Sequence, residues 1–102
     1  MIRAAFRFPS PDAAGFTVEG HAGYADAGED IVCAAVSSAA YMTANTVTEI
    51  LGVKAEAKVK DGYLRFAFTG SSEAAAIVQG LRLHLTELAA QYPGTIQIST
   101  EV

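Results

Sequence analysis

The sequence predicts a two-layer α/β (α+β) sandwich of order ββαββαβ, in which two helices cover one face of a largely antiparallel sheet. Five segments alternate apolar and polar residues with the period of a strand, and each has only one apolar side. Two longer segments carry apolar residues at helical spacing. Strands with a single apolar side bury that side against helices, so both helices are expected on the same face.

Length and composition indicate one folded domain that spans residues 1–102. Hydrophobic residues make up 51% of the chain and charged residues 18%, which is typical of a folded protein. No apolar run reaches the roughly eighteen residues of a membrane span. The first ten residues do not resemble an export signal, and one cysteine cannot form an internal disulfide. We therefore expect a cytoplasmic protein with no membrane partner.

Two alternating segments at the N-terminus predict the first hairpin. In residues 2–8, Ile2, Ala4, Phe6 and Phe8 are the apolar set, and two prolines, a serine and an aspartate then break the pattern at 9–12. In the second segment, Phe16 and Val18 face one way and their polar neighbours face the other. The short distance between the two segments favours an antiparallel pair.

A helix is expected from about Ile31 to Leu51. Asp30 is a good N-cap for it, and Gly52 is a good stop. The apolar stripe of this helix is Val32, Val36, Ala39, Val47, Ile50 and Leu51. The many alanines and serines of the segment predict a smooth surface that can lie close to a sheet or to another subunit.

The second hairpin is the clearest local signal. Residues 53–60 alternate, Asp61-Gly62 supplies a two-residue turn, and the alternation resumes from Leu64 to Phe68. A two-residue turn pairs Lys60 with Tyr63, so the apolar sets of both strands share one face. A second helix then begins at Ser71 or Ser72 and ends at Pro93-Gly94, and a short strand follows. The core positions of that helix are Ile77, Leu81, Leu85 and Leu88.

The charge distribution bears on the class of partner. The net charge is −4, and no Lys or Arg lies between Phe8 and Val53, where six carboxylates fall. An acidic balance argues against a nucleic-acid binder, because such proteins normally show a basic patch. The acidic half of the chain favours a cationic partner; an ordinary acidic surface is an equally good interpretation.

The stretch from Gly20 to Ser38 gathers the reactive side chains. It holds Cys33, the only cysteine, together with His21, three glycines and three carboxylates. If Asp30 caps the helix, Cys33 occupies its first turn, where unpaired N–H groups and the helix dipole favour a thiolate. A glycine-containing loop can bring His21 back against the sulfur. Cysteine with histidine is the minimal set for thiol acyl transfer, and amide hydrolysis is its commonest use.

Each of these residues also has a plainer interpretation. A lone cysteine in an apolar helix is most often a buried small hydrophobe, and a loop histidine is usually only solvated. Ser37, one turn after Cys33, could donate a hydrogen bond to a substrate or simply allow close packing. We expect His84 to be structural, because it lies beside the stripe of the second helix. One cysteine and two distant histidines give poor zinc spacing, so we expect no metal and no cofactor.

The run Gly20-His21-Ala22, then Gly28, then Asp30-Ile31-Val32-Cys33-Ala34-Ala35-Val36-Ser37, closely resembles the signature of the bacterial ribosomal-processing cysteine proteases, the Prp or YsxB-like family. The chain length, the element order and the Asp-Gly hairpin resemble the family as well. The resemblance therefore covers essentially the whole chain, although only the Gly20–Ser37 block is specific.

The resemblance implies an intracellular endopeptidase that removes an N-terminal extension from a large-subunit ribosomal protein, number twenty-seven of the series. It implies Cys33 as the nucleophile and His21 as the general base, with Asp30 and Ser37 in supporting roles. It also implies a homodimer and a substrate loop that contains Gly20, Gly23 and Gly28. From another class, a non-catalytic ribosome-assembly module that binds a basic peptide is the alternative.

Overall fold

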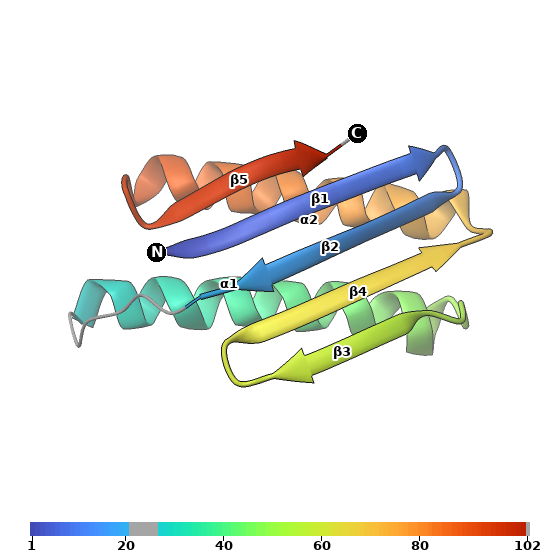
Figure 1. Ribbon diagram of the computed structural model, residues 1–102, viewed down its shortest axis with the longest axis horizontal. Helices are drawn as coiled ribbons and strands as arrows, with labels where there is room; N and C mark the ends of the chain where they lie inside the picture. Colours follow the sequence, from blue (N-terminus) through green and yellow to red (C-terminus); the bar gives the residue numbers. More distant parts are fainter. Residues whose placement is uncertain (21–26, 102) are drawn as a thin grey trace.

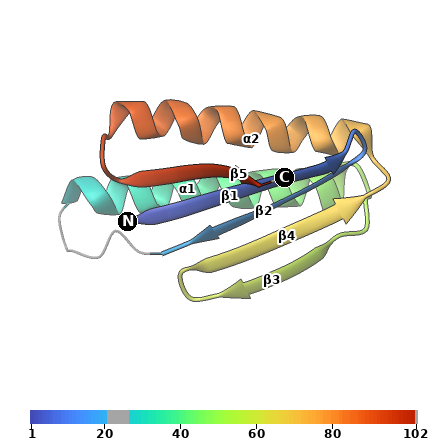
Figure 2. The ribbon, with the colours of Figure 1, turned by 45° about the horizontal axis from the view of Figure 1, so that its top comes forward.

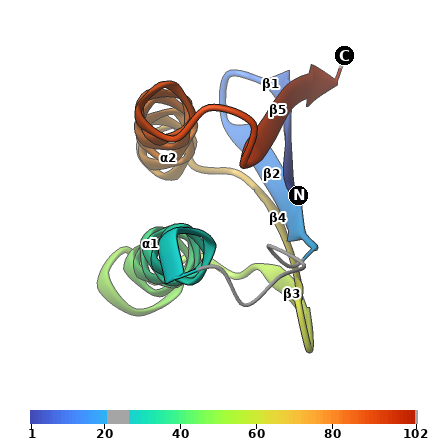
Figure 3. The same ribbon diagram turned by 90° about the vertical axis from the view of Figure 1, so that its left-hand side faces the viewer.

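The chain folds into a five-stranded sheet covered on one face by two helices (Figures 1 and 3). The structure, a computed structural model, describes residues 1–20 and 27–101, and of residues 27–30 the backbone alone. The elements are β1 (Ile2–Ser10), β2 (Ala13–Glu19), α1 (Ala27–Asn45), β3 (Glu56–Lys60), β4 (Tyr63–Thr69), α2 (Ser72–Gln91) and β5 (Ile96–Glu101). The predicted two-layer fold and its element order are confirmed.

The strands lie in the order β3-β4-β2-β1-β5 (Figure 2). Every neighbouring pair is antiparallel except β1 with β5, which run parallel. The second hairpin has the predicted register, with Lys60 opposite Tyr63 and Val59 opposite Leu64. The first strand continues further than predicted, because a register shift between Arg7 and Ser10 accommodates Pro9 within β1.

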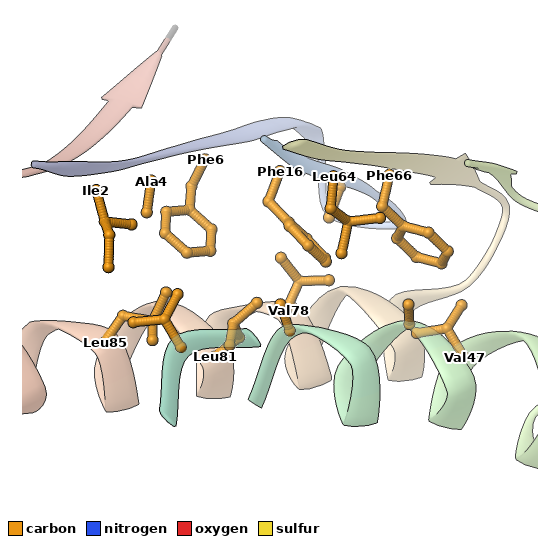
Figure 4. Close-up of a cluster of buried hydrophobic side chains, with 14 of the residues drawn as sticks. Ile2, Ala4, Phe6, Phe16, Val47, Leu64, Phe66, Val78, Leu81 and Leu85 are labelled. Atoms are coloured by element: carbon orange, nitrogen blue, oxygen red, sulfur yellow. The ribbon is translucent and has the colours of Figure 1, made fainter. Parts of the chain in front are cut away.

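The core lies between the sheet and the helices, and three phenylalanines form its centre (Figure 4). Phe6, Phe16 and Phe66 are opposite one another on β1, β2 and β4, and all three are at most 1% exposed. Their ring centroids are 6.2 Å and 5.5 Å apart along this row. The helices contribute buried aliphatic side chains, among them Val47, Val78, Leu81 and Leu85.

The start of α1 differs from the prediction. The helix begins at Ala27, so Asp30 lies inside it and is not the N-cap, and Gly28 also lies in the helix rather than in a loop. The physical reason is available in the sequence: Glu29 and Asp30 are carboxylates in the first turn, where the positive end of the helix dipole favours negative charge. They extend the helix beyond the residue that resembles a cap.

The helical segment ends at Ile50, one residue before the predicted Leu51, and its last turn is not α-helical. After Asn45 the chain continues as a π-helical turn, Thr46–Ile50, and Gly52 then leaves the helix with φ +66°. Val47 is fully buried on the predicted stripe, whereas Ile50, also assigned to the stripe, is 77% exposed. A π-helix has more residues per turn than an α-helix, so within Thr46–Ile50 the α-helical spacing that starts at Val32 no longer places Ile50 on the buried side.

Two further differences concern exposed apolar surface. β3 lies at the edge of the sheet and all five of its residues are exposed, including Val59 at 56%, although the alternation predicted a buried apolar side. By length and composition, the segment Ile31–Ile50 is sufficient to cross a membrane, contrary to the sequence-based expectation. In this fold the same segment buries Val32, Val36 and Val47 against the sheet. The core helix of a folded domain can have the same length and composition, so this segment does not assign the chain to a membrane.

Candidate active site

A pocket of about 220 Å³ opens where α1 faces the ends of β1 and β2 and the β3–β4 turn. Both apolar and polar residues line it. The helix contributes Cys33, Val36, Ser37, Ala40 and Tyr41; the strands contribute Ile2, Val18 and Leu64; Gly20 follows β2; and the turn region contributes Lys60, Asp61, Gly62 and Tyr63. The pocket therefore combines residues that are far apart in the sequence.

Cys33 lies on the helical wall of this pocket. Its side chain is half-buried, packs in part against the core, and is also reached from the pocket. Ser37 and Tyr41 follow at intervals of four residues, so all three share one side of α1. Both of these residues are exposed. The interpretation of Cys33 as a wholly buried hydrophobe does not match this placement.

The predicted position of Cys33 in the first helical turn is wrong. Because α1 begins at Ala27, Cys33 is its seventh residue and lies in the second turn. The effect of a helix dipole on a nearby group falls off within the first turn. The helix end therefore contributes less to thiolate formation than the sequence suggested, and any activation of the thiol has to come mainly from other groups.

Gly20 lines the pocket and is fixed in place by the surrounding backbone. Its N–H donates to the carbonyl of Gly62 in the β3–β4 turn at 2.9 Å, and its φ is +102°. A Cβ at this position would lie 2.5 Å from the carbonyl oxygen of Met1, so no other residue fits without a backbone shift. His21 and Gly23, the other residues predicted for this stretch, lie outside the described residues.

The β3–β4 turn is a part of the pocket that the sequence did not predict. Lys60 and Tyr63 flank the Asp61-Gly62 turn, and the Lys60 Nζ lies 5.6 Å from the centroid of the Tyr63 ring. The Asp-Gly signal identified the hairpin correctly but only as a structural turn. Its position beside Cys33 depends on the pairing of β4 with β2, which is a long-range contact.

His84 lies apart from the Cys33 pocket. It is exposed on α2 and lines a separate hollow of about 180 Å³ between the two helices, with Met42, Thr46 and Gly80 among its neighbours. The structure therefore does not bring this histidine to the cysteine. Its predicted structural role remains a prediction.

Residues 1–97 match the family model of the cysteine protease Prp. The chain belongs to the Prp family. It is accordingly a cysteine protease, a hydrolase of the ribosomal-processing type. The family resemblance drawn from the Gly20–Ser37 block is confirmed, and the family model extends well beyond that block.

Relatives of known name agree with this assignment. The ribosomal processing cysteine protease Prp of Bacillus subtilis is 25% identical over 95 residues, which is 85% of this chain and 85% of the relative. Two structures of the essential ribosomal processing protease Prp from S. aureus, one with a substrate peptide and one with a covalently linked product peptide, have TM-scores of 0.87 and 0.83. Both are 20% identical and cover 99% of this chain and 100% of their own.

A Streptococcus mutans protein has the same fold, with a TM-score of 0.75 and 26% identity over 99% of this chain and 96% of its own. The sheet order and the two-helix layer of this chain are therefore those of the Prp fold. The pocket beside α1 lies within the part of the chain that the family model matches.

Proposed function

We propose that this Prp-family protease removes the N-terminal extension of a large-subunit ribosomal protein, number twenty-seven of the series, with Cys33 as its nucleophile. The observation that carries the proposal is the placement of the only cysteine, half-buried, on the wall of a pocket lined by both apolar and polar residues. Such a pocket holds a peptide segment and keeps bulk water away from part of the reacting carbonyl.

The proposed reaction follows the two steps of thiol acyl transfer. The Cys33 thiolate attacks the scissile carbonyl, and the tetrahedral intermediate expels the amine of the mature ribosomal protein, which takes a proton from His21. The extension then remains attached to sulfur as a thioester. A water molecule that His21 deprotonates hydrolyses the thioester, which releases the extension and restores the thiol.

Two features support His21 as the base. Its neighbour Gly20 lines the same pocket as Cys33, and consecutive Cα atoms are about 3.8 Å apart. The hydrogen bond from Gly20 to Gly62 anchors the chain at that point. Since Cys33 lies beyond the first turn of α1, we assign most of the activation of the thiol to His21 and only a small part to the helix dipole.

Ser37 and Asp30 have supporting roles in this proposal. Ser37 is exposed on the pocket wall one turn after Cys33, where its hydroxyl can donate to the oxygen of the tetrahedral intermediate. The N–H of Gly20 is unsuited to that task, because it already donates to Gly62. We assign Asp30, which lies one turn before Cys33 in α1, to the orientation of the imidazolium.

We also propose a cytoplasmic homodimer that needs no cofactor. Support for the dimer comes from α1, where Ile31 and Met42 are 60% and 68% exposed and no charged residue lies between Asp30 and Glu49. A helix face with this composition is suited to contact with a second copy. A stable pair buries on the order of 1,000 Å² or more.

The substrate is tested by mass spectrometry of the ribosomal protein, expressed with its extension in the presence and absence of this chain. The proposal predicts that the extension is lost only when the chain is present. The matched control is Cys33→Ala, with which the extension stays in place. An intact extension with the parent chain would contradict this substrate assignment.

A further inference from the structure

The open face of the sheet collects most of the positive charge of this acidic chain. Strand residues alternate between the two faces, and the helices cover only one of them (Figure 3). Five of the seven Lys and Arg residues fall on the uncovered face: Arg3, Arg7, Lys58, Lys60 and Arg65. Glu19, Glu56 and Glu101 share it, so the net charge of the face is +2 in a chain of net charge −4.

The strand register arranges these cations in rows. Lys58 is opposite Arg65, which is opposite Thr17 on β2. In the next row Lys60, Tyr63, Glu19 and Arg3 follow one another across four strands. Strands are about 4.8 Å apart, so the second row, which crosses four strands, spans roughly 14 Å. The Arg7 guanidinium lies along the same face and donates to the hydroxyl of Thr17 at 3.1 Å.

Lys58 and Arg65 form a cross-strand pair of like charge. Such pairs destabilise a sheet, because the two side chains are held about 5 Å apart at Cβ. Within residues 1–20 and 27–101, no ion pair joins a cation of this face to Glu19, Glu56 or Glu101. In the strand register Arg3 lies opposite Glu19 and Arg7 beside Glu101. The positive charge without an acidic cross-strand neighbour is therefore concentrated at Lys58, Lys60 and Arg65 on β3 and β4, which is where we expect an anion to bind.

We propose that this open sheet face binds RNA. The cations extend over the surface of the sheet, as the spaced phosphates of a polynucleotide require. Tyr63 provides an aromatic ring between them, and a ring on a sheet surface is a common platform for an unpaired base. The net charge of −4, which argues against a nucleic-acid binder, averages over the whole chain, whereas this face alone carries a net charge of +2.

Other partners fit this face less well. A basic ribosomal-protein segment is repelled by it. An anionic membrane surface usually also receives large apolar side chains, and the strand residues of this face include no Leu, Ile, Val, Phe or Met. RNA is the most abundant anion around a ribosomal protein, so the proposal rests on the proposed function for its choice of partner.

The face continues into the pocket that contains Cys33. Lys60 and Tyr63 belong to the cationic rows and also line the pocket. RNA bound to the sheet would therefore hold a ribosomal particle beside the pocket mouth. Lys58 and Arg65 do not line the pocket, so changes at these two positions separate RNA binding from peptide cleavage.

The test is fluorescence anisotropy of a labelled single-stranded RNA of about thirty nucleotides, titrated with the full chain over a series of salt concentrations. The test variant is Lys58→Gln with Arg65→Gln. The matched control is Gln79→Glu with Gln91→Glu, which makes the same change in net charge on exposed positions of α2. Circular dichroism confirms that both variants are folded.

We expect the parent chain to bind, with an affinity that falls as salt rises. Loss of two phosphate contacts should weaken binding by roughly tenfold near 0.1 M salt and reduce the salt slope by about 1.4. The control should stay within about twofold of the parent. No binding at low salt would overturn the proposal, as would equal weakening in both variants. Tighter binding to polyglutamate or to phosphatidylserine vesicles than to RNA would overturn it too.

Two further measurements keep this proposal separate from the proposed protease function. Cleavage of a free extension peptide should be the same for Lys58→Gln with Arg65→Gln as for the parent. RNA binding by Cys33→Ala should equal that of the parent. If the parent binds RNA as described but cleaves no ribosomal protein, the assigned substrate is wrong and the RNA face stands.

Discussion

Cys33 shares its pocket with a serine on the same helix and with a glycine from the end of β2. Ser37 lies one turn along α1, and the N–H of Gly20 already donates to the carbonyl of Gly62. The position of Cys33 in the second turn reduces the contribution of the helix dipole. We therefore expect deprotonation of the Cys33 thiol to depend on a side-chain base.

Replacement of His21 tests that dependence. His21→Ala should slow alkylation of Cys33 by iodoacetamide near neutral pH by about tenfold or more, because alkylation follows the thiolate and not the thiol. The rate is measured by intact-protein mass spectrometry. The matched control is His84→Ala, which removes the other histidine from an exposed site on α2. Equal rates in both variants would remove His21 from the proposed mechanism.

Ser37→Ala tests the oxyanion role of the hydroxyl. We expect kcat/KM for peptide cleavage to fall by about tenfold, equivalent to about 1.4 kcal/mol of transition-state stabilisation. The stability should change by less than about 0.5 kcal/mol, because the residue is exposed. Ser38→Ala is the control, since Ser38 is the neighbouring exposed serine but does not line the pocket. A similar loss of activity in both variants would contradict the role.

At the scale of elements, the hairpins and helices were predictable and their mutual placement was not. The Asp61-Gly62 turn fixed the register of β3 with β4, and helical spacing identified the buried side of α2. The N-cap rule failed at Asp30 because the carboxylates of the first turn extend α1 to Ala27. The pairing of β4 with β2 is long-range, so the turn beside Cys33 could not be foreseen.

The like-charge pair on the open face predicts a stabilising substitution. Lys58→Glu should raise the free energy of unfolding by about 0.2–1 kcal/mol, because it converts repulsion with Arg65 into attraction. Urea denaturation measures the change, which should shrink as salt rises. Lys54→Glu is the control, because Lys54 lies before the first residue of β3. A lower stability of Lys58→Glu would show that the pair is not strained.

At the scale of the whole molecule, two surfaces differ sharply in character. The outer side of α1 is uncharged and carries exposed Ile31 and Met42, whereas the open sheet face carries most of the cations. Neither surface is evident from composition, because net charge averages over both. For example, the strand order is needed to recognise that Arg3 and Lys58 lie on the same face of the sheet.

The α1 surface is tested by light scattering at micromolar concentration. We expect the parent chain to be a dimer and Met42→Glu to be a folded monomer, since a charge at the centre of an apolar interface is costly. Leu83→Glu is the matched control, as Leu83 is 60% exposed on α2 and should leave the dimer intact. A monomeric parent chain would refute the homodimer.

The central claim is that the thiol of Cys33 cleaves the extended ribosomal protein. The most direct measurement is mass spectrometry of that purified protein after incubation with equal amounts of the parent chain and of Cys33→Ala. The account predicts that the parent removes the extension and that Cys33→Ala, folded and with only the sulfur lost, leaves the substrate intact. Removal of the extension by Cys33→Ala at the parental rate would contradict the account.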